Sequence, residues 1–223
     1  MTAQNPIIIT LDFAAYLQQR ITITLEATAP ALIFEALAVG NGVSVEHLSV
    51  RDVAGNPIDY EQDDNRLQIS STPYHISYTL RTQYDVCVGV DRDYYLIYPF
   101  MNPEEIFIGA GAIPYPADEP APYQLNIINL PEHLLSFTSL EPMYPEKLQS
   151  FFFYASHQKQ LAMFTYTSVS GHQLHLNFMV QHGKTLPIEL AQLNDFLQDW
   201  LHFLETTLTP YERIDHINIL MLQ

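Results

Sequence analysis

Two stretches near the start of the chain carry the strongest structural signal: Ile7-Ile-Ile-Thr-Leu-Asp-Phe13 and Ile21-Thr-Ile-Thr-Leu25. In both, every second residue is a large apolar one, which places these side chains on one side. Successive side chains of a β-strand point to opposite faces, so this alternation predicts two half-buried strands. Residues 14–19 between them predict a long hairpin loop or a short turn.

The same alternation continues along the chain, interrupted by turn signals such as Asn41-Gly42 and Ala54-Gly55-Asn56-Pro57. The polar residues 61–65 predict a loop. Further strands are expected at residues 43–50, 67–69, 76–80, 125–128, 151–154, 161–167 and 174–180. Strands at this spacing favour an antiparallel β-sandwich or a large sheet.

The middle of the chain is rich in proline, with six prolines between Pro99 and Pro122. Proline lacks an amide donor, so we expect no central strand in this region. A disordered linker would not hold so many aromatic residues, and ordered loops that cover a sheet are the better interpretation. One aromatic group is a candidate patch for a peptide or partner, with packing in the core as the favoured alternative: Tyr94, Tyr95, Tyr98 and Phe100.

Near the C-terminus the apolar residues change to helical spacing, recurring at steps of three and four: Leu190, Leu193, Leu197, Trp200, Leu201, Leu204 and Leu208. We expect this stripe to pack on the chain's own sheet, and docking on another protein is the alternative. Residues 214–222 predict a final strand. The expected fold is thus mainly β (α+β), with an antiparallel β domain at 1–181 and a helix–strand extension at 182–223 that packs on it.

Composition excludes several classes of function. The 223 residues include 9 Lys and Arg against 25 Asp and Glu, a formal charge of −16, which argues against nucleic acid and anionic membranes as partners. Cys87 is the only cysteine, so an internal disulfide and a cysteine-based zinc site are excluded. The sequence shows no secretion signal and no apolar run of about 18 residues, so a cytoplasmic location is the expectation.

No coherent catalytic set emerges from the motifs. H-E-x-x-H and G-x-S-x-G are absent, and Gly109-Ala-Gly-Ala-Ile-Pro114 has proline where a dinucleotide loop needs its third glycine, so a turn is expected there. His172 and His175 have odd spacing in an expected strand, which sends them to opposite faces and makes them poor co-ligands of a metal. We therefore expect no cofactor. The enzymatic alternative is a hydrolase in which one of four histidines meets an acid in space: His133, His157, His172 or His175.

The order of these elements resembles the N-terminal β domain of glycyl-aminopeptidase-type zinc metallopeptidases, a family that also carries a PDZ domain. The resemblance includes a strand that meets a d-x-x-G turn (Asp52-Val-Ala-Gly55) and a later i-x-Y-x-v strand (Ile76-Ser-Tyr-Thr-Leu80). Residues 102–109 and 122–131 are similar to the family's middle strands. The closing helix and the strand around 211–222 look like the start of the family's catalytic domain.

The resemblance implies a fold rather than an activity. In that family a Gly-Gly-Leu-Glu-His-like segment and the zinc-binding H-E-x-x-H helix would follow after residue 223, so no ligand or general base is carried over to this sequence. The family's W-x-P-G segment is also missing, because the only tryptophan, Trp200, lies in the expected helix. We therefore expect a non-catalytic module that binds a peptide or a separately encoded catalytic half. The remaining alternative is a structural subunit whose helix and aromatic patch are buried against a partner.

Overall fold

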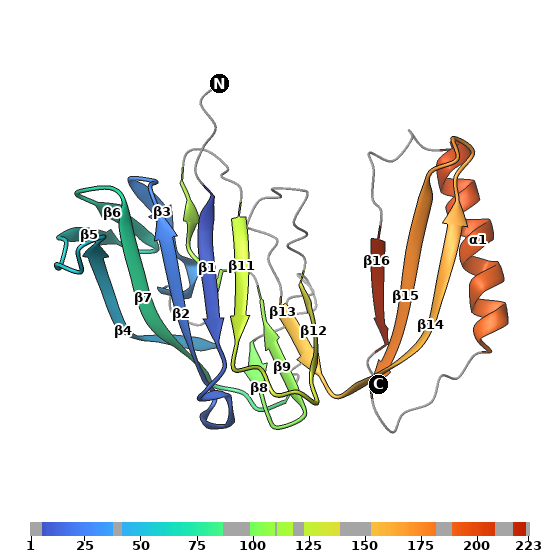
Figure 1. The fold of residues 1–223 in the computed structure, drawn as a ribbon, viewed down its shortest axis with the longest axis horizontal. Coiled ribbons are helices and arrows are strands. Elements are labelled where there is room, and N and C mark those ends of the chain that lie inside the picture. Colours follow the sequence, from blue (N-terminus) through green and yellow to red (C-terminus); the bar gives the residue numbers. More distant parts are fainter. Residues whose placement is uncertain are drawn as a thin grey trace. The chain divides into compact units, whose positions relative to one another are not determined.

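The computed structural model describes residues 6–37, 42–86, 99–109, 111–117, 123–138, 153–181, 189–207 and 216–221. The chain divides into two compact units, Met1–Ser156 and His157–Gln223, called unit 1 and unit 2 below. Strands make up most of the described structure, and one long helix lies in unit 2 (Figure 1). The mainly β class and the C-terminal helix and strand are therefore confirmed.

A five-stranded sheet forms the centre of unit 1. Its strands lie in the order β11 (Tyr123–Ile128), β1 (Ile7–Asp12), β2 (Arg20–Ala27), β7 (Tyr74–Thr82) and β4 (Val43–Asp52). The alternation predicted for the first two strands is confirmed, because every second residue, from Ile7 in β1 and from Ile21 in β2, is buried while the residues between them are at least partly exposed. A 3-10 turn, η1 (Tyr16–Gln18), joins these two strands.

Two smaller sheets complete unit 1. One contains β10 (Tyr115–Pro116), β3 (Ala31–Ile33), β6 (Arg66–Ile69) and β5 (Tyr60–Asp63), in that order. The other contains β12 (Leu135–Thr138), β13 (Phe153–Ser156), β9 (Glu105–Ile108) and β8 (Phe100–Met101). A short 3-10 helix, η2 (Glu35–Leu37), follows β3.

One core joins the three sheets of unit 1. The rings of Phe13, which follows β1, and Phe153 in β13 stack with centroids 5.0 Å apart. Phe34 and Tyr78 approach to 4.7 Å, and the Tyr78 hydroxyl donates a hydrogen bond of 2.6 Å to the carbonyl oxygen of Ala112. Complete burial raises the pKa of the Tyr78 hydroxyl, which therefore stays protonated and keeps donating.

Two expectations were wrong: a loop at the polar residues 61–65, and no central strand in the proline-rich region between Pro99 and Pro122. Residues 60–63 form the edge strand β5 rather than a loop, and only Asp64 and Asn65 turn, with Asp64 at φ +51°. Pairing with β6 overrides the polar composition because an edge strand can expose both faces. In the proline-rich middle, β9 is an inner strand of its sheet, which is possible because no proline lies within it.

The bulge in β4 explains why its apolar pattern is irregular. The register against β7 shifts between Glu46 and Ser49, and His47 takes a φ of +57°. One extra residue on β4 turns its two halves so that Val45 and Val50 both pair with inward-facing residues of β7. Strict alternation would have placed one of them on the outer face.

Between the strands that the structure describes, two pairings are parallel, which the antiparallel expectation did not include. β1 pairs in parallel with β11, and β15 (Gln173–Gln181) pairs in parallel with β16 (His216–Met221). In unit 2 the connection from β15 to β16 contains helix α1 (Leu190–Thr207), and a crossover of this length is what parallel neighbours require.

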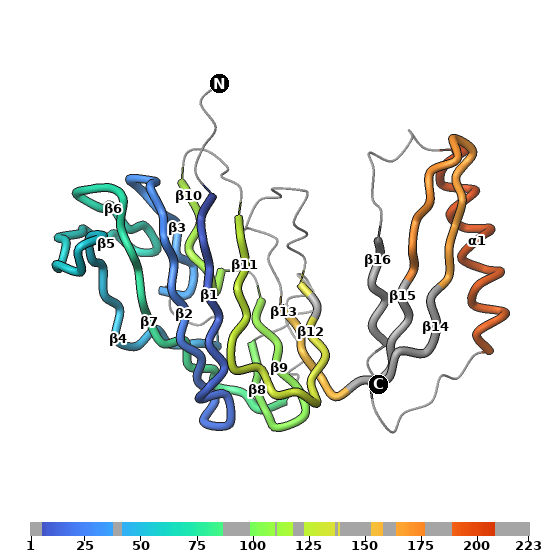
Figure 2. The backbone as a smooth tube through the Cα atoms, viewed as in Figure 1, coloured from blue at the N-terminus to red at the C-terminus, as the bar shows by residue number. Residues whose placement is uncertain are grey.

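Unit 2 has its own sheet, with the order β14 (Gln158–Thr167), β15 and β16. β14 and β15, close to the strands expected at 161–167 and 174–180, form a hairpin around Gly171, which has a φ of +83°. The compact units therefore divide at Ser156/His157 and not at the expected 181/182, because the β14–β15 hairpin pairs with β16 and packs on α1. Figure 2 traces α1 along this hairpin.

Candidate interaction surface

Helix α1 packs on the hairpin through leucines at helical spacing. Leu197 and Leu201 are 9% and 3% exposed and form a small core with Tyr166, Leu174 and Leu176 of the hairpin. Leu193 packs partly buried beside them. The expected packing of the leucine stripe on the chain's own sheet is thus observed for these side chains.

A carboxylate fixes the C-terminal part of α1 to the hairpin. Glu205 accepts a hydrogen bond of 2.7 Å from the Tyr166 hydroxyl, and its two carboxylate oxygens accept bonds of 2.9 and 3.1 Å from the backbone amide of Val169. Closer to the middle of the helix, the Gln198 amide donates to the carbonyl oxygen of Thr165. Because these contacts set the rotation of α1 about its axis, they also determine which of its side chains face outward.

Three aromatic side chains of α1 remain exposed. Phe196, Trp200 and Phe203 are 62%, 47% and 58% exposed, and we call these three residues the aromatic face. They recur at i, i+4 and i+7 and therefore form one stripe about 10 Å long. At about 100° per residue, the stripe is turned by roughly 110° about the helix axis from Leu197 and Leu201.

The area of the aromatic face is large enough to matter. An aromatic side chain presents roughly 150–250 Å² when fully accessible, so three of them at about half exposure leave roughly 300 Å² open to water. Contiguous apolar patches of this size on a single chain are often functional. Trp200 was expected within the buried stripe, but its exposure places it on the aromatic face instead.

An acidic edge runs along the aromatic face. Asp195 and Asp199 are exposed and lie one turn apart, on the side of the stripe away from the buried leucines. Residues 190–207 of α1 contain no Lys or Arg and no other Asp or Glu, so these two carboxylates and Glu205 carry the formal charge of the helix. With Glu205 bound to the hairpin, Asp195 and Asp199 are the charges that a partner on the aromatic face would meet.

Of the candidate patch expected from the sequence, the structure describes one residue. Phe100 in β8 is 2% exposed and stacks on Phe107 with ring centroids 5.9 Å apart, so for this residue core packing is observed. Tyr94, Tyr95 and Tyr98 lie outside the described residues, as does Cys87. A role of these tyrosines in binding stays a prediction.

Two histidines of the enzymatic alternative lie near uncharged oxygen atoms. The Nε2 atom of His133 lies 3.2 Å from the carbonyl oxygen of Pro103, and the Nδ1 atom of His175 lies 3.2 Å from the Thr165 hydroxyl. In the part of the chain that the structure describes, no three His, Cys, Asp or Glu residues lie together as metal ligands would. No helix among the described residues is long and apolar enough to cross a membrane.

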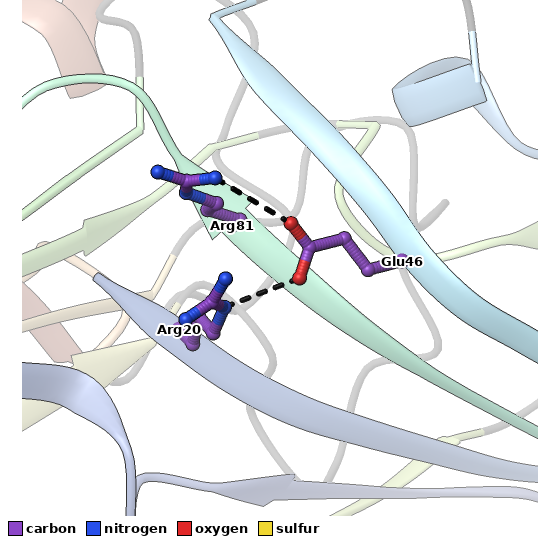
Figure 3. Close-up of polar contacts among 3 residues, drawn as sticks. All are labelled: Arg20, Glu46 and Arg81. Atoms are coloured by element: carbon purple, nitrogen blue, oxygen red, sulfur yellow. Dashed lines mark hydrogen bonds and ion pairs between the residues drawn. The ribbon is translucent and has the colours of Figure 1, made fainter. Parts of the chain in front are cut away.

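Three charged side chains of unit 1, Arg20, Glu46 and Arg81, form a cluster that the sequence analysis did not predict. Arg20 in β2 and Arg81 in β7 are direct neighbours in the register, and Glu46 in β4 binds both, at 3.1 Å to Nε of Arg20 and 3.7 Å to Nη1 of Arg81 (Figure 3). Like charges on opposite strands repel, and the carboxylate offsets this repulsion. Both carboxylate oxygens of Glu46 are engaged, so the cluster ties three strands together rather than presenting a free acid.

Comparison with known proteins shows which solved structures share this fold. No protein-family model matches the chain, and no curated protein matches it in sequence. Solved structures do match. An aminopeptidase N family protein from Idiomarina loihiensis aligns with a TM-score of 0.61 at 8% identity, over 95% of this chain and 38% of its own.

Two further structures give the same result. Aminopeptidase A from Legionella pneumophila, in complex with aspartic acid, has a TM-score of 0.61 at 15% identity over 98% of this chain and 28% of its own. An M1 zinc metallopeptidase from Deinococcus radiodurans, bound to a Tyr-Ser-Ala substrate, has a TM-score of 0.54 at 11% identity over 99% of this chain and 56% of its own. The chain thus spans 28% to 56% of the length of these proteins. Its fold is that of the N-terminal β domain of such aminopeptidases, as the resemblance in the sequence implied, and the match extends over both units.

Proposed function

We propose that this chain is a non-catalytic, peptidase-related module that binds another protein or a peptide. The observation that carries the proposal is the aromatic face of α1, three large exposed side chains on a helix whose other apolar face already packs on its own sheet. Clustered aromatic residues supply most of the binding energy in many protein interfaces. The fold of the chain supports the link to peptidases. The location that we propose for it is the cytoplasm.

A second version of this function is a subunit of a split metallopeptidase. It is favoured by the fold, which this chain shares with the matched aminopeptidases. In this version the partner is a separately encoded catalytic half. Both versions share the expectation that the chain by itself does not hydrolyse peptides.

The non-catalytic part is tested on the purified chain. Zinc is measured by atomic absorption, and turnover is measured with a panel of aminoacyl-β-naphthylamide substrates, with and without added zinc. We expect zinc far below one ion per chain and no hydrolysis above the blank. Stoichiometric zinc together with aminopeptidase turnover would overturn this part, and loss of that turnover on substituting His133, His157, His172 or His175 by alanine would establish the hydrolase alternative.

The binding part is tested in the cells from which the chain comes. A tagged chain is isolated under mild conditions, and its complexes are sized and identified by mass spectrometry. We expect a second polypeptide at a fixed stoichiometry. A chain that stays monomeric and alone at its cellular concentration contradicts the binding role, and a partner with an H-E-x-x-H helix supports the split-peptidase version.

A further inference from the structure

The aromatic face and its acidic edge together describe the chemistry of a partner. Phe196, Trp200 and Phe203 form a narrow, straight apolar stripe, and Asp195 and Asp199 form a negative border along one side of it. Unit 2, which carries this face, has six acidic against three basic residues in its sequence, so its own formal charge is negative too. A surface that complements these features is apolar in the middle and positive at its border.

We propose that the aromatic face is covered by a cationic amphipathic helix of another polypeptide. Leucine-like side chains of this helix lie on the three aromatic rings, while its Lys or Arg side chains lie against Asp195 and Asp199. A stripe at i, i+4 and i+7 spacing matches the side-chain ridges of a second helix. Lys and Arg side chains are also attracted to the ring of Trp200. This inference rests on the proposed binding role and adds the chemistry of the partner.

The same charges disfavour a second copy of the chain as the occupant. In a face-to-face antiparallel pair about a two-fold axis, the acidic edges of both copies lie on the same side of the interface. Each copy has a formal charge of −16, and α1 has no Lys or Arg to neutralise the partner's Asp195 and Asp199. A cationic helix removes this repulsion.

The first test uses two synthetic peptides as probes. One is an 18-residue amphipathic helix of Leu and Lys, and the other has Glu in place of every Lys. Trp200 is the only tryptophan of the chain and belongs to the aromatic face, so its emission reports contact directly. We expect the Lys peptide to shift the emission to shorter wavelength and to saturate at one peptide per chain, and the Glu peptide to have no effect.

Variants separate docking on this face from attraction to an acidic protein. Phe196→Ala combined with Phe203→Ala keeps the Trp200 reporter and is expected to weaken binding of the Lys peptide at least about tenfold. Asp195→Asn with Asp199→Asn is expected to weaken binding about threefold or more and to reduce its salt dependence. The matched control is Asp59→Asn with Glu61→Gln, which removes two exposed charges from unit 1 and is expected to leave the affinity unchanged.

Three results with the Lys peptide or the isolated chain would overturn the inference, and a fourth concerns a cellular partner. Equal affinity of the Lys peptide for the wild type and the Phe196→Ala/Phe203→Ala chain would assign binding to general charge attraction. If the Asp195/Asp199 and the Asp59/Glu61 substitutions weaken binding of the Lys peptide equally, binding is likewise due to general charge attraction. A dimer in sedimentation velocity that dissociates in the Phe196→Ala/Phe203→Ala chain would make a second copy the occupant. If a cellular partner binds the wild type and this variant equally, the proposed function stands and only the docking on this face fails.

Discussion

The substitution Gly111→Ala tests how η2 is held in unit 1. Gly111 has a φ of +83°, and its carbonyl oxygen accepts a hydrogen bond of 2.9 Å from the amide of Ala36. A Cβ atom added at Gly111 would lie 2.7 Å from the Cβ atom of Glu35. Glu35 has little freedom to move away, because its carboxylate accepts a hydrogen bond of 2.9 Å from the Tyr115 hydroxyl and its neighbour Ala36 is bound to Gly111 itself.

The expected cost has two parts. The left-handed backbone costs a non-glycine residue about 1–2 kcal/mol, and the close contact adds about 1–3 kcal/mol as overpacking does elsewhere. Alanine also restricts the unfolded chain, which returns up to about 1 kcal/mol. With about 1 kcal/mol returned, the net destabilisation of Gly111→Ala is about 1–4 kcal/mol, and its upper end is a large fraction of the stability of an ordinary domain.

A second glycine supplies the matched control. Gly55, in the turn after β4, has a φ of +89°, but an added Cβ meets nothing within 4 Å. Gly55→Ala therefore carries the backbone cost without the contact, and we expect a loss of no more than about 2 kcal/mol. Both glycines belong to unit 1, so their effects are compared in the same transition.

The assay is urea denaturation followed by far-ultraviolet circular dichroism, with tryptophan emission recorded in parallel to follow unit 2. The reasoning predicts that Gly111→Ala loses at least about 1 kcal/mol more than Gly55→Ala. Equal losses for both variants would show that the contact with Glu35 does not constrain the backbone. A Gly111→Ala chain as stable as the wild type would refute the geometry of η2 as well.

Three further perturbations test other parts of the structure. Tyr78→Phe leaves the buried carbonyl of Ala112 without its donor and is expected to cost about 1–3 kcal/mol in thermal or urea unfolding, with an unchanged midpoint as the contrary result. Glu205→Ala removes three hydrogen bonds between α1 and the hairpin and is expected to lower the unfolding midpoint seen by the single tryptophan; no shift would mean that the leucines alone hold the helix. The side-chain and backbone hydrogen bonds from Asn56 lower the pKa of Asp52, so the stability of this turn is present above the ordinary carboxyl pKa and is lost as pH falls through the lowered value. Asn56→Ala should raise the pKa of Asp52 in an NMR titration, and an unchanged titration would contradict this assignment.

Local patterns in the sequence predict those strands and helices whose apolar residues recur at one regular spacing. Alternation located β1 and β2, and the three-to-four-residue spacing located α1, because burial on one face leaves a direct mark on the sequence. The same logic did not find β5, whose exposed residues form a strand only because β6 lies beside it. It also placed the unit boundary too late, since β15 pairs with a strand that follows about 35 residues later.

The aromatic face shows a second limit of such patterns. Seven apolar residues between Leu190 and Leu208 were grouped into one stripe, and Trp200 was placed among the buried leucines. Phe196 and Phe203 carry the missing signal, because with Trp200 they form a second stripe on a helix that already has a buried one. An apolar arc wider than one packing face is the sequence feature that indicates an additional contact surface. The partners of Glu46 could not be found this way, because they come from strands brought together only by the fold.

Quenching of tryptophan emission by acrylamide tests the central claim most directly, namely that this chain leaves an aromatic face uncovered. It is measured on the wild type, and on chains in which Trp200→Phe is combined with Phe196→Trp or with Phe203→Trp. We predict that the indole is readily quenched at all three positions in the isolated chain and becomes protected at all three when the Lys peptide is bound. An indole that is already shielded at these positions in the isolated chain would show that the chain covers this face itself, and would contradict the account.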